Sequence, residues 1–314
     1  MFLIIIIYGV VIYPICHGIS QIKKEKLFTT EAGKRIVSSL STITTTTASS
    51  TACASLCTSD KDCMTASYFN ISKQCKLDSD CNPTTENWQN GILIRLKTIP
   101  SDCSEFPDGT IDGVYTISIN NDCIDVYCDM VDKWTVIQRR QDGSIDFYRD
   151  WLDYKNGFGD LSGEYWLGND KISNILNGKS YSLRFDLEDW YGERRYAQYE
   201  TFSIADESAE YQLTLAGYSG DAGDSMLDSY QPLNLNGQRF STKDRDNDDD
   251  DTGGQCALTQ KGGWWYKWCT YSNPNGLYFL GTEPDHSGIY WYTWNASIPF
   301  YRMKSVTMKI KRLP

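Results

Sequence analysis

An acidic run over residues 244–251 carries the most evident chemistry in the sequence. It holds six aspartates, and three of them stand two residues apart: Asp244, Asp246 and Asp248. This spacing lets a turning backbone direct carboxylate oxygens toward one point, as Ca²⁺ requires with its about six to eight oxygen ligands. The run is not an EF-hand, because the positions that should be Gly and Glu are Asp249 and Gln255. Taken alone, the run fits a Ca²⁺ site and a solvated acidic loop equally well.

Two cysteines follow the acidic run. Cys256 and Cys269 enclose residues 262–266, Gly-Gly-Trp-Trp-Tyr, which are too apolar to lie loose in water. A disulfide that closes this segment is worth about 3 kcal/mol in the chain-entropy model. We therefore expect these two cysteines to be bonded to each other.

The composition restricts the compartment and the partners. The net charge of −11 argues against nucleic acid, whose phosphates would repel such a surface. Eleven cysteines indicate an oxidising compartment. Only two histidines occur, His17 and His286, and the sequence has no nucleophile elbow, phosphate-binding loop or zinc motif. We therefore expect a protein that is not an enzyme.

The first 18 residues predict a secretory signal peptide. Residues 1–16 are almost all apolar, and small or polar residues follow. The run is short for a membrane span of about 20 residues, and an uncleaved anchor is the alternative. Cleavage near Gly18 removes Cys16 and leaves ten of the eleven cysteines, an even number. No second apolar run follows. We expect a secreted, extracellular product without membrane insertion.

Residues 103–314 resemble the fibrinogen C-terminal domain, which fibrinogen chains, ficolins, tachylectins, angiopoietins and tenascins share. The motifs follow in the family's order: Cys-Ser-Glu at 103–105, Gly-Glu-Tyr-Trp-Leu-Gly-Asn at 163–169, the acidic run, and Asn-Pro-Asn-Gly-Leu-Tyr at 273–278. The resemblance implies a mainly β globular domain with few helices. It also implies two disulfides, Cys103 with Cys128 and Cys256 with Cys269.

Residues 25–97 resemble a PAN or apple module. The pattern Cys-x3-Cys-x5-Cys, an aromatic pair and a fourth cysteine carries the resemblance, at Cys53, Cys57, Cys63 and Cys75. In such modules a short helix is stapled onto a small sheet, because so few residues bury too little apolar surface to fold unaided. We pair Cys57 with Cys63 and Cys53 with Cys75, although spacing does not fix connectivity. A generic disulfide-stapled small domain is the alternative.

The expected fold class is therefore α+β and mainly β. A small disulfide-stapled PAN/apple-like module is followed by a fibrinogen C-terminal-like globular domain, with residues 98–102 as the linker. Residues 23–52 are rich in Ser and Thr, which by composition alone suggests an O-glycosylated linker. The strand character of Ile36, Val37 and Leu40 favours the module instead.

Two cysteines and two sequons complete the covalent picture. Parity leaves Cys81 and Cys123, and we pair them as a bridge between the two modules. An intermolecular bridge at Cys123 is the alternative. The sequons at Asn70 and Asn295 predict N-glycans on solvent-facing loops.

The fibrinogen-like resemblance implies a specific set of Ca²⁺ ligands. Carried onto this chain, the two carboxylates are Asp246 and Asp248, and the backbone carbonyls lie between Asp250 and Thr252. Eight positions separate Asp248 from Cys256, a longer loop than the family's usual one. The ion would be a structural cofactor that fixes the loop and opposes carboxylate repulsion.

The resemblance also implies a ligand pocket beside this loop. Lectin members hold acetyl groups there and use a His directly after the second cysteine, joined to it by a peptide bond that can be cis. This chain has Thr270 at that position and Gln260 where such lectins often have an aromatic residue, so the acetyl-binding signature is only partly present. Apart from these two residues, the expected lining comes from the following side chains: Tyr271, His286, Tyr290 and Trp291.

Two functional hypotheses follow. The first is a secreted, calcium-binding recognition lectin that binds glycans or acetylated groups in innate immunity. The alternative is a non-lectin extracellular ligand or matrix protein that binds protein partners through either module, and the altered positions Gln260 and Thr270 favour it. No collagen-like or coiled-coil tract precedes the domain. A homo-oligomer would therefore have to form through the apple-like module or through intermolecular bridges.

Overall fold

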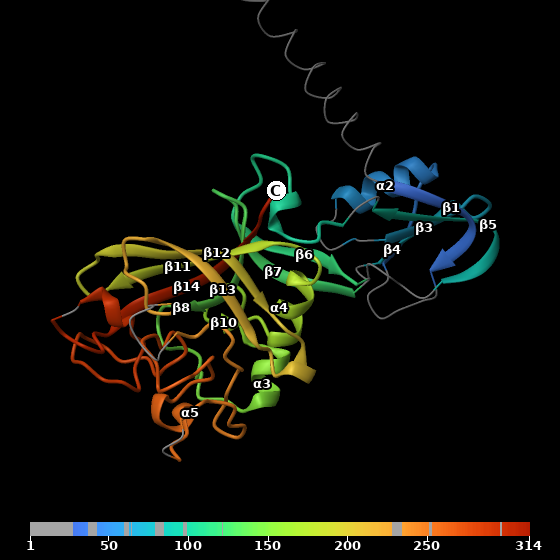
Figure 1. Cartoon of the computed structure of the whole chain (residues 1–314). Coiled ribbons are helices and arrows are strands. Elements are labelled where there is room, and N and C mark those ends of the chain that lie inside the picture. The colour runs from blue at the N-terminus through green and yellow to red at the C-terminus, as the bar shows by residue number, and fades with distance from the viewer. Residues whose placement is uncertain are drawn as a thin grey trace, which may run out of the picture. The chain divides into compact units, whose positions relative to one another are not determined.

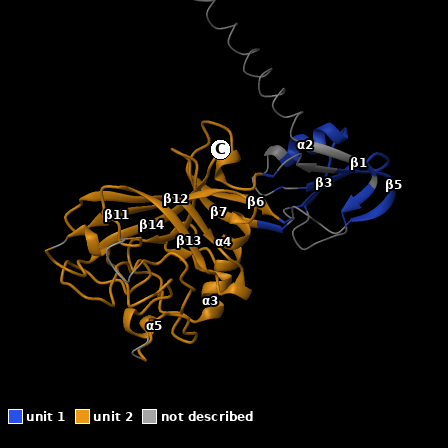
Figure 2. Ribbon diagram, viewed as in Figure 1, with its two compact units in different colours: residues 1–99, 120–123 blue, residues 100–119, 124–314 orange. Residues whose placement is uncertain are grey.

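The computed structural model describes most of the chain. The described residues are 28–36, 43–59, 63, 65–78, 85–96, 99–120, 122–227, 234–250, 253–295 and 297–314. The predicted signal peptide, Cys81 and Thr252 lie outside them. The chain divides into two compact units, residues 1–99 with 120–123 and residues 100–119 with 124–314 (Figure 2). In the described part of the chain, no helix is both long enough and apolar enough to span a membrane.

The described residues of the first unit form a five-stranded antiparallel sheet with one helix. The strand order is β1-β5-β3-β4-β2 (Figure 1). The bounds are β1 Phe28–Ile36, β2 Ile43–Thr46, α2 Ser50–Ser59, β3 Thr65–Phe69, β4 Gln74–Asp78 and β5 Thr85–Leu96. The Ser/Thr-rich stretch thus contributes β2, whose Thr44 and Thr45 pair with Lys76 and Cys75. The hypothesis of an O-glycosylated linker, which rested on composition alone, does not account for this strand.

Two disulfides hold the core of the first unit. They join Cys53 to Cys75 and Cys57 to Cys63, the same pairs that we expected from the sequence. All four cysteines are buried, and the other buried members of this cluster are few: Ala66, Tyr68 and Leu77. Because this apolar cluster is small, the unit depends on the covalent bridges from α2 for its stability.

The second unit is built on a larger sheet, mainly antiparallel. The strand order is β13-β12-β11-β14-β8-β10-β9, with β7 paired to β6 and β8 (Figure 1). Its strands are β6 Gly113–Ile119, β7 Asp122–Asp129, β8 Trp134–Arg140, β9 Phe158–Gly159, β10 Tyr165–Trp166, β11 Tyr181–Asp189, β12 Arg194–Ile204, β13 Leu213–Gly220 and β14 Met303–Arg312. The described residues of this unit also form three α-helices: α3 Trp151–Asn156, α4 Asn169–Leu176 and α5 Cys256–Gln260. The fold class is therefore α+β and mainly β.

Strand β14 lies in the interior of this sheet, between β11 and β8. Lys309 and Lys311 alternate with apolar residues, a pattern typical of a strand with one face in solvent, yet Lys309 is buried. Its ammonium group lies 2.7 Å from the Asp129 carboxylate and 2.6 Å from that of Asp186. A buried charge must be paired, and strands on both sides of β14 supply the partners. The alternation in the sequence did not show these neighbours.

A cluster of large aromatic residues fills the core of the second unit. Trp166, Phe240 and Trp265 pack with ring centroids 5.1–6.3 Å apart. Trp264 packs beside them and, like Trp265, comes from the apolar segment between Cys256 and Cys269. This segment therefore anchors the described residues of 221–302, which are mostly irregular, to the sheet, and they form the region that surrounds α5 (Figure 1).

The buried Glu164 organises the turn after β8. Its Oε1 accepts hydrogen bonds from the backbone N–H groups of Gln141, Asp142 and Gly143, at 2.7–3.0 Å. The same oxygen lies 3.6 Å from Nε of Arg140, which is 1% exposed. Gly143 has a φ of +74°, and a Cβ there would meet the Tyr278 ring at 2.8 Å, so the turn requires glycine.

We expect Glu164→Gln to lower the free energy of unfolding by about 3 kcal/mol, because it leaves the buried Arg140 without its counter-charge. The amide also replaces an acceptor by a donor that faces backbone N–H groups. Urea unfolding monitored by tryptophan fluorescence measures the change. Glu200→Gln, at an exposed position in β12, is the matched control and should change stability by less than about 0.5 kcal/mol. Equal stability of the two variants would contradict this role of Glu164.

Candidate functional site

The acidic run divides into residues with different roles. Asp244 Oδ1 accepts hydrogen bonds from the backbone N–H of Trp151, at 2.8 Å, and from Thr242 Oγ1, at 2.7 Å. Asp244 therefore holds the start of α3 in place. The buried Asn247 donates from Nδ2 to the Phe240 carbonyl at 2.7 Å. This bond fixes the loop to the segment that contains Phe240. Asp246 and Asp248 are the residues directly before and after Asn247.

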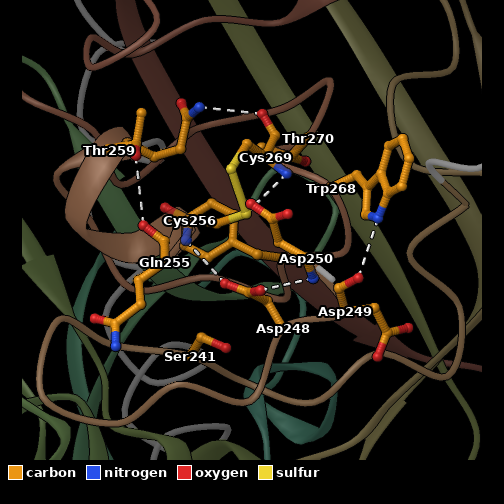
Figure 3. The surroundings of a disulfide bond; sticks show 12 residues. Ser241, Asp248, Asp249, Asp250, Gln255, Cys256, Thr259, Trp268, Cys269 and Thr270 are labelled. Atoms are coloured by element: carbon orange, nitrogen blue, oxygen red, sulfur yellow. Dashed lines mark hydrogen bonds between the residues drawn. A yellow bond between two sulfur atoms is a disulfide. The ribbon is translucent and has the colours of Figure 1, made fainter. Parts of the chain in front are cut away.

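Two backbone N–H groups hold the carboxylate of Asp248 in place. Its Oδ1 accepts from the backbone N–H of Asp250 at 2.9 Å, and its Oδ2 accepts from that of Cys256 at 2.8 Å (Figure 3). Burial, with the negative charge of Asp246 as a further cause, raises the pKa of Asp248 to about 6. Neither carboxylate forms an ion pair with any lysine, arginine or histidine that the structure describes. The two carboxylates therefore repel each other, and no side chain in the described ranges supplies a compensating positive charge.

This donor set fits a hard cation. Two carboxylates that share one loop, one of them half-buried, match the oxygen ligands that Ca²⁺ takes. Asp246 Oδ1 also accepts weakly from the Asp248 N–H, at 3.3 Å, so the two residues lie in one tight turn. Of the carbonyl donors expected from the sequence, Asp250 is described and Thr252 lies outside the described residues. Asp246 and Asp248 would hold the ion.

The neighbourhood of Asp250 does not form a thiolate metal site. Ligand atoms of Asp250, Cys256 and Cys269 lie within 4.8 Å of one another, but the two cysteines are bonded to each other. Their sulfur atoms are therefore not thiolates, the form in which cysteine binds metals. The carboxylate of Asp250 lies beside this disulfide in Figure 3. Asp246 and Asp248, by contrast, offer carboxylate oxygens, which are the ligands that a hard cation takes.

The acidic loop is clamped to the segment before Cys269. The N–H of Asp249 donates to the Lys267 carbonyl at 3.2 Å, and Nε1 of Trp268 donates to the Asp249 carbonyl at 3.0 Å. The Asp249 side chain itself accepts from Gln238 Nε2 at 3.1 Å. Hydrogen bonds within the protein thus engage both the backbone and the side chain of Asp249. Trp268 is a contact of the loop that the sequence pattern did not single out.

The disulfide Cys256–Cys269 connects the loop to the pocket region. Cys256 begins α5, and its N–H is the donor to Asp248 described above. The Cys269 carbonyl accepts from Gln260 Nε2 at 3.1 Å. Cys269 and Thr270 have φ values of +40° and +60°, and the peptide bond between them is trans. The cis bond found in lectin members of the family is therefore absent at this position.

Four of the six predicted pocket residues are closed off from solvent. Gln260, Thr270, Tyr290 and Trp291 are each at most 3% exposed. The Tyr290 hydroxyl donates to Gln260 Oε1 at 3.1 Å, and burial raises the pKa of Tyr290 well above its usual value. Nε1 of Trp291 donates to the Gly223 carbonyl at 2.8 Å. Internal hydrogen bonds satisfy these side chains, so they form packing beneath the surface and not the lining of an open pocket.

The open pocket beside this region has a different lining. It has a volume of about 360 Å³ and is formed by six residues: Thr259, Pro284, Asp285, His286, Ser287 and Phe300. Of the predicted residues, only His286 belongs to it. Tyr271 instead stacks on Tyr292, with ring centroids 4.3 Å apart. We name this hollow the His286 pocket.

The loop that carries His286 has a recognisable turn sequence, Asp-x-Ser. Asp285 and Ser287 form a turn in which Asp285 Oδ1 accepts from the Ser287 N–H at 2.8 Å and from its hydroxyl at 2.7 Å. Partial burial opposes ionisation, but these bonds, with Arg302 nearby, lower the pKa of Asp285. The Asp-x-Ser spacing is typical of such turns. The turn fixes the backbone on both sides of the exposed His286.

Comparisons with known proteins identify the class. Residues 99–313 match the family of the C-terminal globular domain of fibrinogen beta and gamma chains, and residues 28–91 match the PAN domain. The chain therefore belongs to the fibrinogen C-terminal domain family, with a PAN domain before that domain. Both matches lie close to the ranges expected from the sequence, 103–314 and 25–97.

Individual relatives support the same assignment. Fibrinogen-like protein 1 of Homo sapiens is 43% identical over 227 residues, which cover 67% of this chain and 72% of the relative. The fibrinogen-like globe domain of human ANGPTL6 superposes with a TM-score of 0.63 at 39% identity, over 69% of this chain and 99% of that one. Lamprey fibrin D-dimer, complexed with the peptide ligand Gly-His-Arg-Pro-amide, gives 0.62 at 35% identity, over 68% and 74%.

We expect Tyr290→Phe to lower the free energy of unfolding by about 1 kcal/mol, because the change leaves the buried Gln260 Oε1 without its donor. Chemical denaturation measures the difference. Tyr292→Phe is the matched control, since Tyr292 is partly exposed and its hydroxyl forms no hydrogen bond with the residues that the structure describes. If the two variants were equally stable, the Gln260–Tyr290 bond would not be what closes this region.

Proposed function

We propose that this chain is an extracellular recognition protein that binds a polypeptide partner through the His286 pocket. The observation that carries this proposal is the difference between two neighbouring places. Gln260, Thr270 and Tyr290 are closed by internal hydrogen bonds, whereas Asp285, His286 and Phe300 line an open hollow. The chemistry available to a ligand is therefore that of the second group.

The lining of the His286 pocket suits a peptide. Asp285 supplies an ionised carboxylate, His286 an imidazole and Phe300 an apolar ring, with the two rings 5.4 Å apart. A ligand that complements all three needs a cationic or hydrogen-bonding group next to an apolar one, as polypeptide side chains provide. The lamprey relative was solved with a short peptide ligand that contains both kinds of group.

We further propose that Ca²⁺ is a structural cofactor held by Asp246 and Asp248. When bound, the ion would neutralise the two carboxylates and remove the repulsion between them. The support is the half-buried carboxylate of Asp248 and the absence of a protein cation beside it in the described residues. Because Asp248 also accepts from the Cys256 N–H, the ion would steady the first turn of α5.

The extracellular location rests on the disulfides. Four lie among the described residues, and Cys123 is disulfide-bonded as well. Its predicted partner Cys81 lies outside the described residues. Such bridges persist in oxidising compartments, which agrees with the predicted signal peptide. We propose a binding role and not a catalytic one, with the PAN domain as a second place for protein partners.

Glycan binding is the second candidate function. The stacked rings of Tyr271 and Tyr292 lie beside Phe300, whose ring centroid is 5.8 Å from that of Tyr292, and all three are partly exposed. Flat aromatic faces of this kind suit a sugar ring. The closed Gln260 and Tyr290 favour the peptide over an acetyl group, because an acetyl group would have to displace their hydrogen bond. Innate immune recognition belongs to this second candidate.

The Ca²⁺ site can be tested separately from the partner. We expect Asp248→Asn to weaken Ca²⁺ binding by at least about 100-fold in titration calorimetry of the purified chain, because it removes a charged ligand. Asp244→Asn is the control and should change the affinity by less than about threefold, since Asp244 is committed to Trp151 and Thr242. Equal losses in both variants would indicate diffuse screening by the acidic run.

The partner class can be tested with defined probes. The purified chain is applied to an immobilised array of short basic peptides, including Gly-His-Arg-Pro-amide, and to a glycan array with acetylated sugars. We expect retention on peptides and a loss of at least about tenfold in apparent affinity with His286→Ala. Leu152→Ala, at an exposed position on α3, is the control and should leave retention unchanged. Retention on glycans alone, sensitive to His286→Ala, would support the second candidate.

A further inference from the structure

A second and larger hollow lies on the fibrinogen-like unit. It has a volume of about 600 Å³, which is within the usual range for ligand sites. Three segments form it: the β11–β12 turn with Asp189, Tyr191, Glu193 and Arg195, the loop 282–284, and the segment that contains Trp294, Asn295, Ile298 and Tyr301. None of the functions discussed above uses it. We name it the Tyr191 hollow.

A rigid turn holds Tyr191 at the edge of this hollow. The buried Asp189 accepts from the backbone N–H groups of Tyr191 and Glu193 through Oδ1, at 2.8 and 2.9 Å. Its Oδ2 accepts from the Tyr301 hydroxyl at 3.3 Å. Burial, with the charge of Asp189 as a further cause, raises the pKa of Tyr301 to about 12, so the hydroxyl remains a donor. The buried Asp189 thus fixes the backbone of the turn that carries Tyr191.

The ring of Tyr191 is mostly uncovered in the described part of the chain. It is 82% exposed and forms no aromatic contact there. The structure therefore presents a flat aromatic face beside a hollow, a combination that can accept a ligand with an apolar face.

Asn295 brings a candidate occupant to the same place. Asn295 is one of the residues that line the hollow, and it is the acceptor residue of a sequon. Oδ1 of Asn295 accepts from the Ser297 N–H at 3.1 Å, while Nδ2 donates to none of the described residues. The nitrogen to which a glycan would be attached thus has no hydrogen-bond partner among the described residues, and it belongs to a residue of the hollow's wall.

We propose that an N-linked glycan on Asn295 docks its first sugar in the Tyr191 hollow, against the Tyr191 ring. The C–H face of a pyranose matches an aromatic face, and its hydroxyls and acetamido group need hydrogen-bond partners. The exposed Glu283 carboxylate and the Thr282 hydroxyl supply these partners. Glu193 is held by Arg195 at 2.7 Å, and Arg195 donates to the Trp294 carbonyl at 2.8 Å, so the opposite wall is preformed.

The docked sugar would also border the proposed partner site. Pro284 lines both the Tyr191 hollow and the His286 pocket, so the loop 282–287 separates the two. A glycan held in the first hollow covers one side of this loop and leaves the His286 side open. Only this consequence rests on the proposed function, since glycan docking itself needs no partner.

The test follows the release of the glycan from the folded, full-length chain after secretion from a glycosylating host. Glycopeptide mass spectrometry first establishes occupancy at Asn295. The rate of enzymatic release at Asn295 is then compared for the wild type and Tyr191→Ala under native conditions. We expect release to be about fivefold faster in the variant, equivalent to about 1 kcal/mol of lost contact. Tyr191 is exposed, so its replacement leaves the core intact.

Controls separate docking from a general effect on the glycans. The release rate at Asn70, on an exposed turn of the first unit, should be the same in both proteins. Val131→Ala, at another exposed apolar position, should not alter release at Asn295. Absence of a glycan at Asn295, or equal release rates for the wild type and Tyr191→Ala, would overturn the proposal. Neither result would bear on peptide binding at His286, which is measured independently.

Discussion

Buried backbone groups impose the main constraint on the fibrinogen-like unit, because only short helical segments occur among the described residues of 221–302. A buried N–H or carbonyl without a partner costs about as much as a lost hydrogen bond, so side chains must replace the missing ladders. Asn273 Nδ2 donates to the carbonyls of Gln260 and Gly288 at 2.8 and 2.9 Å. Asn275 Nδ2 donates to that of Gly263 at 2.9 Å. These amides set the shape of the irregular region and the position of its hollows.

The acidic loop and the pocket region share one chain of contacts. Asp248 accepts from the N–H of Cys256, Cys256 is bonded to Cys269, and the Cys269 carbonyl accepts from Gln260. Gln260 in turn accepts from the Tyr290 hydroxyl. Three hydrogen bonds and one covalent bridge therefore connect the acidic loop to the buried side chains beside the His286 pocket. Because Gln260 and Tyr290 bond to each other, a partner at the His286 pocket meets the residues that line that pocket instead.

Local patterns predicted more of this molecule than long-range contacts did. Cysteine spacing and family motifs predicted both modules and the pairs Cys53–Cys75 and Cys256–Cys269, because closure of a short loop depends on nearby residues. The pocket lining was predicted poorly. Tyr290 and Gln260 are 30 residues apart, and nothing local shows that they bond and close the space. The burial of Lys309 depends on carboxylates from two other strands in the same way.

The central place of β14 has a consequence for the order of folding during synthesis. Residues 303–312 separate β11 from β8, so neither strand has its full set of neighbours until this segment has left the ribosome. The PAN domain contains its own sheet and disulfides and can close as soon as it enters an oxidising compartment. The fibrinogen-like unit cannot complete its sheet, and β11 lacks one of its neighbours, until residues 303–312 have been synthesised. During this interval the unit resembles an open sheet, the state in which chaperones bind proteins and aggregation begins.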